Sequence, residues 1–174
     1  MFRYLPLLIL LICCACEGRT AARKAARGPN FVPEPNHLFF KNTRARHYNA
    51  EEVTNRATIY RHGGLFQSAA NLRPALIDNW LQDRAVIRFE IAPDLPDLTD
   101  WTLKIQRRSG AEEALLLSTP PTNRELVKLM AVLNGKEALF LFSPIDTILP
   151  AFPDEAGRQH ARTVIKDYLT LVDH

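Results

Sequence analysis

The chain has 174 residues, of which 47% are apolar and 24% are charged, and this composition excludes a disordered protein and suits one globular domain behind a short leader. The net charge is only +3, which excludes the strongly basic surface that nucleic-acid-binding proteins use. The positive charge gathers near the N-terminus, because residues 17–62 hold nine Lys/Arg against four Asp/Glu. Such a segment is either attracted to anionic lipid head groups or is a solvated linker.

The first sixteen residues have the pattern of an export signal. Arg3 precedes a nearly unbroken apolar run from Tyr4 to Ile12, which is too short to cross a bilayer comfortably. Ala15-Cys16 resembles the end of a bacterial lipoprotein signal, where a small residue stands before the cysteine that receives the lipid. The resemblance implies cleavage before Cys16, acylation of its thiol and its new amine, and membrane attachment through this lipid.

Other interpretations of the leader stay open. Leu11-Ile12-Cys13-Cys14 is a second, poorer register for lipidation, so Cys13, Cys14 and Cys16 all remain candidates. A plain cleaved signal is another alternative. An uncleaved anchor is the last, because four basic residues follow the apolar run and would orient the body toward the cytoplasm. They are Arg19, Arg23, Lys24 and Arg27.

The positions of the cysteines and prolines indicate where the leader, a tether and the folded domain begin and end. All three cysteines lie in the leader, so lipoprotein processing leaves no internal disulfide, and an exported domain of this size builds its core without one. Pro33 and Pro35 favour extended backbone. We expect a lipoprotein signal peptide over residues 1–15, a flexible tether over 16–36 and a single domain over 37–174.

The first half of the domain has mostly strand-like patterns. Residues 37–41 are aromatic, and residues 57–61 are β-branched and aromatic, so both favour strands. Residues 50–53 favour a single helical turn. Residues 72–81 fit either a helix of one to two turns or a short strand, and residues 85–91 form a clearer strand.

The second half has a hairpin and two well-marked helices. Apolar and polar residues alternate over 101–106, and residues 113–118 return to complete the hairpin. Thr122 and Glu125 form a capping box at the start of a helix whose apolar stripe is Leu126, Leu129, Met130 and Leu133, with Gly135 at its C-terminal cap.

A short strand and a second helix complete the chain. Residues 138–142 form a continuous apolar run, which is typical of a central strand covered on both faces. Asp154 is a suitable N-cap for a helix that reaches Val172. The buried face of this helix is expected at Ala161, Val164, Ile165, Tyr168 and Val172.

This order of elements predicts an α+β fold, a mostly antiparallel sheet with two helices packed on it. If residues 138–143 pair in parallel with residues 113–118, the helix between them makes a right-handed crossover.

One basic segment is the candidate surface for a partner. Its cations stand beside Phe39, Phe40 and Tyr48 and would suit an acidic glycan, a lipid phosphate or an acidic protein. The partner-binding residues predicted here are Lys41, Arg44, Arg46 and His47. The alternative is a solvated strand edge that discourages aggregation.

Arg61-His62-Gly63 resembles the Arg-His-Gly signature of the histidine phosphatases. The resemblance implies a catalytic pair, in which His62 attacks a phosphoryl group and Arg61 holds its oxygens. The continuation differs, however, since the acid phosphatase branch has Arg and Pro where Leu65 and Gln67 stand here. The family also needs a second histidine, and we expect His160 to lie too far along the C-terminal helix.

Other constellations point to no particular chemistry. Trp80 and Trp101 suit either sugar stacking or the core, and Asp94, Asp97 and Asp100 lack the spacing of a calcium loop. The sequence contains no nucleophile-elbow, metalloprotease or Cys-x-x-Cys motif and no phosphate-binding glycine loop. We therefore expect no cofactor and no metal.

Several short motifs resemble small, uncharacterised bacterial envelope lipoproteins. They are Phe-Phe-Lys-Asn-Thr-Arg, Ile-Tyr-Arg, Asp-Asn-Trp before a short strand and the closing Asp167-Tyr168-Leu169. This resemblance implies a location and no reaction. The sequence thus favours a lipid-anchored, non-enzymatic accessory or adaptor protein outside the cytoplasm, with a phosphoryl-transfer hydrolase as the alternative.

Overall fold

The computed structural model describes residues 28, 30–53, 56–93, 95, 101–107, 109–135, 137–143 and 148–172. The predicted signal peptide, Cys16 and most of the predicted tether lie outside these residues, as do Asp94, Asp97 and Asp100. Among the described residues, no helix combines the length and the hydrophobicity that a bilayer span requires.

The architecture is α+β, as expected, but it contains two four-stranded antiparallel sheets. The first is a meander of β1 (Tyr48–Val53), β2 (Ala57–His62), β3 (Leu72–Asn79) and β4 (Arg84–Ile91), in that order. The second has the order β6-β5-β7-β8, and its strands are β5 (Thr102–Gln106), β6 (Glu112–Leu115), β7 (Ala138–Phe142) and β8 (Ile148–Pro150).

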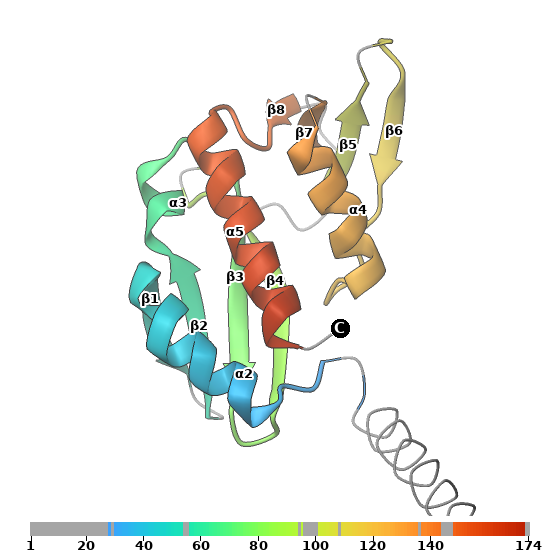
Figure 1. The fold of residues 1–174 in the computed structure, drawn as a ribbon. Helices are drawn as coiled ribbons and strands as arrows, with labels where there is room; N and C mark the ends of the chain where they lie inside the picture. Colours follow the sequence, from blue (N-terminus) through green and yellow to red (C-terminus); the bar gives the residue numbers. More distant parts are fainter. Residues whose placement is uncertain are drawn as a thin grey trace, which may run out of the picture.

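Helices cover one side of these sheets, and the longest of them runs across the molecule (Figure 1). They are α2 (Glu34–Phe39), α3 (Gly63–Gln67), α4 (Asn123–Asn134) and α5 (Glu155–Leu171), with the π-helix η1 (Phe40–Arg44) and the 3-10 helix η2 (Ala45–His47) continuing α2. One hydrophobic core joins both sheets to α4 and α5, with Leu76, Leu133, Leu141 and Ile165 among its fully buried side chains.

The two sheets are linked through one residue after β8. The backbone N–H of Ala151 donates to Leu139 O at 2.7 Å, and Ala151 O accepts from the N–H groups of Asn71 and Leu72 at 3.0 and 3.1 Å. Ala151 therefore connects the end of the second sheet to the beginning of β3.

The two helices predicted from local signals are confirmed. Thr122 caps α4 with Glu125 in a capping box, and Asp154 accepts the Gly157 N–H at the start of α5 at 2.7 Å. The expected apolar stripes of both helices are buried or, at Met130, partly buried. Both helices are specified by residues close in sequence, which explains the agreement.

Two elements near the N-terminus were predicted wrongly. Residues 37–41 belong to α2 and η1, because a proline at the first turn of α2 is compatible with a helix start and the aromatic Phe40 turns inward into the core. Residues 50–53 form the end of β1, where Glu51 and Glu52 lie exposed at a sheet edge. Pairing with β2 overrides their weak helical preference.

The structure decides between the alternatives that the sequence left open for residues 72–81 and for the pairing of residues 138–143. Residues 72–79 are a strand, and Pro74 is tolerated because the ladder between β3 and β2 begins only at Ala75. β7 pairs antiparallel with β5, so the parallel pairing of 138–143 with 113–118 is wrong. Alternate residues of β7 are only partly buried, so its two faces are not equally covered.

The segment before α2 is packed on the body. Phe31 forms an antiparallel bridge with Arg84, the Val32 N–H donates to Asp83 O at 2.7 Å, and Val32 is buried in the core. Asn36 Nδ2 donates to Thr170 O at 3.0 Å near the end of α5. The structured body therefore includes residues 30–36, which the sequence assigned to the tether.

Candidate functional site

The four predicted partner-binding residues lie on η1 and η2 and face different surroundings. Arg44 points toward α5, whereas Lys41 lines a hollow that it shares with Trp80. Arg46 and His47 are exposed neighbours, and Arg46 Nε lies 3.3 Å from His47 Nε2. These residues therefore lie on a helical surface at separate positions, and the strand edge considered as the alternative is not formed here.

Arg44 belongs to a partly buried network that fixes η1 to α5. Its Nε donates to Asp167 Oδ1 at 2.9 Å, and the Tyr48 hydroxyl donates to Asp167 Oδ2 at 2.7 Å. Burial, together with this hydrogen bond, raises the pKa of Tyr48, and the Asp167 carboxylate raises the pKa of Arg44. Asp167 is only 8% exposed, so its charge is held by these two partners.

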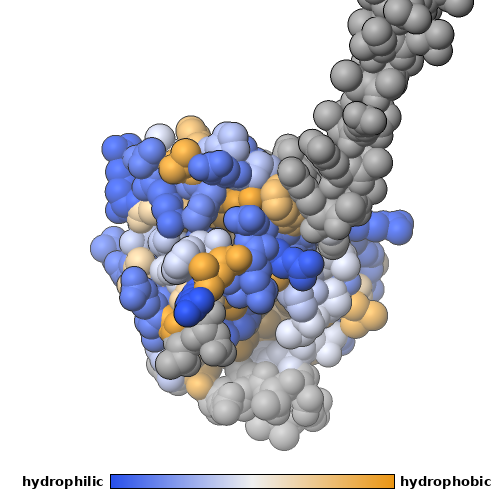
Figure 2. Space-filling view, turned by 90° about the horizontal axis from the view of Figure 1, so that it is seen from below, coloured by the Kyte–Doolittle hydropathy of each residue, from blue (hydrophilic) through white to orange (hydrophobic). Residues whose placement is uncertain are grey.

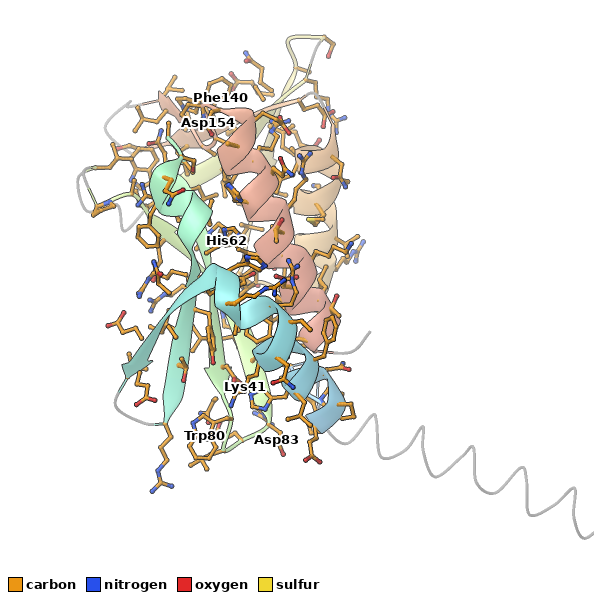
Figure 3. The ribbon with its side chains drawn as sticks, turned by 60° about the vertical axis from the view of Figure 1, so that its left-hand side comes forward. Lys41, His62, Trp80, Asp83, Phe140 and Asp154 are labelled. Atoms are coloured by element: carbon orange, nitrogen blue, oxygen red, sulfur yellow. The ribbon has the colours of Figure 1, made fainter. Side chains whose placement is uncertain are left out.

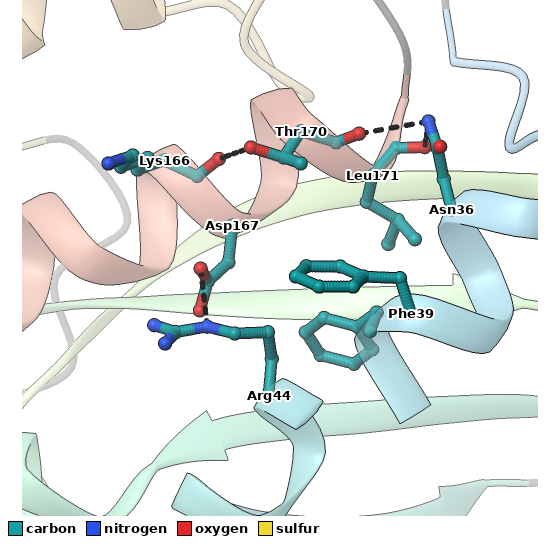
Figure 4. Close-up of a pocket in the computed structure, with 8 residues that line it drawn as sticks. Asn36, Phe39, Arg44, Lys166, Asp167, Thr170 and Leu171 are labelled. Carbon is teal, nitrogen blue, oxygen red and sulfur yellow. Dashed lines mark hydrogen bonds and ion pairs between the residues drawn. The ribbon is translucent and has the colours of Figure 1, made fainter. Parts of the chain in front are cut away.

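A pocket of about 310 Å³ lies between α2, η1 and the last turns of α5. Figure 4 shows its lining: the cationic side chains of Arg44 and Lys166 lie toward one end, and Phe39 and Leu171 lie toward the other. Lys166 is exposed, and Phe39 is 53% exposed. The pocket thus offers a positive group beside an apolar surface, a combination that suits an anionic group attached to an apolar one.

A cluster of three histidines lies next to this network. The ring centroid of His62 is 4.7 Å from that of His160 and 6.5 Å from that of His47, and the Tyr48 ring packs edge-on at 5.1 Å. Burial and the neighbouring His160 and His47 lower the pKa of His62 to about 4. His62 is therefore neutral at physiological pH.

Gly64 is required for this close packing. A Cβ at this position would lie 2.4 Å from His160 Nε2, and the Gly64 N–H donates to His62 Nδ1 at 3.2 Å.

Over the described residues, no group of three His, Cys, Asp or Glu side chains comes together in a way that would hold a metal ion.

Arg61 lies on the opposite face of β2 from His62, as expected for consecutive residues of a strand. Its Nε and Nη2 donate to the two carboxylate oxygens of Glu90 at 2.7 and 2.9 Å, and its Nη1 pairs with Glu51. These carboxylates raise the pKa of Arg61. A guanidinium held in this way does not face a phosphoryl group that His62 could attack.

The two tryptophans have different environments. Trp80 is exposed at the turn between β3 and β4. Trp101 is partly buried and lines an apolar groove of about 560 Å³ along the edge of β4, where its indole N–H has no hydrogen-bond partner among the described residues. Trp80 shares its hollow with one carboxylate, Glu52, and no described carboxylate lines the groove at Trp101.

Sequence reasoning missed several residues of this region. Lys166 was not singled out, and Asp167 was named only as part of a family motif. His160, expected to lie too far along α5, packs directly on His62. One local signal was present: His160 and Asp167 are seven residues apart, so they share a helix face. A polar pair on the face expected to be apolar marks a site where α5 meets polar partners.

Comparison of the chain with protein-family models, with curated proteins and with solved structures found no match in any of the three. The functional argument therefore depends on the leader sequence and on the surfaces described above.

Proposed function

We propose that this protein is a lipid-anchored, non-enzymatic accessory protein of the bacterial cell envelope, which binds an acidic segment of another envelope protein. The lipid is attached at Cys16, and the body acts outside the cytoplasm. The pocket between α2 and α5 is the observation that carries the binding proposal.

The anchor is supported by the order of features in the leader. Arg3, the apolar run up to Ile12 and Ala15-Cys16 occur in the sequence expected of a lipoprotein signal. The cysteines lie only in this leader, so the body has no other thiol that a lipid would modify.

The binding site is supported by its charge and shape. Lys166 is an exposed cation in the wall of the pocket. Arg46 is an exposed cation two residues after Arg44, whose own charge is compensated by Asp167. Phe39 and Leu171 supply an apolar surface in the same pocket. An acidic side chain of a partner protein would meet the cations, and an adjacent apolar side chain would contact Phe39.

The histidine-phosphatase alternative has weaker support. Arg61 and His62 point to opposite faces of β2, and Arg61 is held by Glu90 and Glu51. A hydrolase of that kind needs both side chains on one substrate. We therefore favour the binding function.

The anchor is tested by replacing single cysteines of the leader. Cys16→Ser is expected to abolish acylation and to move the protein out of the membrane fraction, because the lipid acceptor is lost. Mass spectrometry of the purified chain and fractionation of cells measure both effects. Cys14→Ser is the matched control and should be acylated and retained as the natural chain is. A chain that keeps its lipid in Cys16→Ser contradicts the assignment.

The binding surface is tested by charge reversal. Arg46→Glu combined with Lys166→Glu is expected to abolish crosslinking in cells to the acidic partner, since two exposed cations beside the pocket change sign. Crosslinking followed by mass spectrometry identifies the partner with the natural chain and quantifies it with each variant. Thermal unfolding should be nearly unchanged, because neither side chain is buried.

A control with the same change of charge separates this surface from overall electrostatics. Arg107→Glu with Lys128→Glu reverses two exposed cations that line neither this pocket nor the neighbouring hollow at Lys166, and it should leave the crosslinking intact. Equal crosslinking by the two double variants would exclude the pocket as the partner site. Arg44 is unsuitable for this test, because its replacement would also break the contact with Asp167.

A further inference from the structure

Large apolar side chains are exposed at one end of the molecule. Trp80 and Leu81 form the tip of the turn between β3 and β4, and each is 47% exposed. The turn is closed by the Gln82 N–H, which donates to Asn79 O at 3.1 Å, and Asp83 adopts a positive φ of 48°. A tight turn therefore holds an aromatic and an aliphatic side chain outward.

The N-terminal segment meets the body at this same turn. The Val32 N–H donates to Asp83 O at 2.7 Å, and the Ala85 N–H donates to Asn30 O at 3.0 Å. Figures 1 and 3 show that the start of α2 and the β3–β4 turn share one end of the molecule, with Trp80 and Asp83 near each other. The attachment point of the leader and the exposed tryptophan are thus neighbours.

α2 and η1 add to this end. Leu38 is 52% exposed on α2, and Lys41 lines a hollow together with Trp80. The charges at this end are mixed, since Arg84 is exposed beside Asp83 and Glu52 shares the hollow with Lys41. Figure 2, which views the molecule from below, accordingly shows hydrophobic side chains among hydrophilic ones. Such a surface suits the interfacial region of a bilayer, where tryptophan and lysine are enriched.

The length of the connecting chain limits how far this end can be from the lipid. Asn30 lies fourteen positions after Cys16, so even a fully extended chain between them spans at most about 50 Å. We propose that the end formed by Leu38, Trp80 and Leu81 docks on the membrane that holds the lipid anchor, with Trp80 at the lipid–water interface. This inference rests on the proposed anchor and adds an orientation: the binding pocket would lie beside the membrane surface.

Tryptophan fluorescence of the full acylated chain tests the docking. The chain has two tryptophans, so Trp101→Phe leaves Trp80 as the single reporter, and Trp80→Phe leaves Trp101. Each protein is reconstituted in vesicles of phosphatidylethanolamine and phosphatidylglycerol, with and without lipids brominated in the acyl chains. We expect bromination to reduce Trp80 emission about twofold and to leave Trp101 emission nearly unchanged, because only Trp80 lies at the interface.

The outcomes separate the docking from the anchor. Protein that sediments with the vesicles but shows no stronger quenching of Trp80 than of Trp101 overturns the docking and leaves the anchor intact. Protein that fails to sediment shows that the anchor itself is absent, and the docking falls with it.

A second measurement does not depend on removing Trp101. Leu81→Cys carries a nitroxide spin label at the turn, and Leu116→Cys carries the same label at an exposed position next to β6. The label at position 81 should be several-fold more accessible to oxygen than the label at position 116 when the protein is on vesicles. Equal accessibility at both positions overturns the docking.

Discussion

Replacing Asp167 with Ala should lower the free energy of unfolding by about 2–4 kcal/mol, because the change removes the shared acceptor of Arg44 and Tyr48. The lower part of this range reflects Arg44, which is 32% exposed and regains water when its partner is lost. The Tyr48 hydroxyl is buried and is left without an acceptor. Chemical denaturation measures the loss.

Two companion variants show whether burial is the cause. Tyr48→Phe should cost about 1 kcal/mol in the natural chain and much less in the Asp167→Ala background, since the hydroxyl then has no bond to lose. Glu113→Gln is the matched control, because Glu113 also pairs with two cations, Arg107 and Lys128, but its side chain is 37% exposed. A loss for Asp167→Ala no larger than that for Glu113→Gln would contradict the proposed network.

The second large effect is a dependence of stability on pH through His62. Burial together with His160 and His47 holds its pKa at about 4 in the folded chain, against 6.5 for an unperturbed histidine. The neighbouring Asp167 acts in the opposite direction, and Arg44 lowers the pKa further. Between these two pH values the unfolded chain binds a proton that the folded chain does not.

Stability is therefore expected to be fully present above about pH 6.5 and to decrease as the pH falls toward 4, by as much as about 3 kcal/mol from this group. His62→Asn keeps an acceptor for the Gly64 N–H and removes the titration. The difference between the two curves of unfolding free energy against pH isolates the contribution of His62. An NMR titration of the imidazole with a midpoint near 6.5 would refute it.

Local signals in the sequence predicted the second half of the fold better than the first. Thr122, Glu125 and Asp154 act within a few residues of their own helix starts, and the apolar stripes of α4 and α5 repeat at helical spacing. No local signal of this kind marks residues 50–52 as a strand, because this strand forms only through pairing with β2. Phe39 and Phe40 led to the wrong prediction of a strand at residues 37–41, because contacts with α5 and the core decide for the helix.

The candidate site was predicted only in part, for a related reason. The sequence identified the basic residues of η1 and η2, but Asp167, which distinguishes Arg44 from the others, lies more than a hundred residues away. The hydrogen bond to Asp167 gives Arg44 a structural role, whereas Arg46 remains exposed. His160 reaches His62 because α5 packs against α3, where Gly64 leaves room for an imidazole ring. The spacing of residues in the sequence does not predict this arrangement.

The short antiparallel contact of residues 30–32 with the beginning of β4 has a mechanical consequence. Any tension on the leader reaches the body through the backbone bonds of Val32 to Asp83 and of Ala85 to Asn30, before it reaches the contact of Asn36 with α5. These two hydrogen bonds lie at the edge of the sheet, and they would break first under tension. A pull on the N-terminal segment would then release several residues from the body while β1 to β4 keep their pairing.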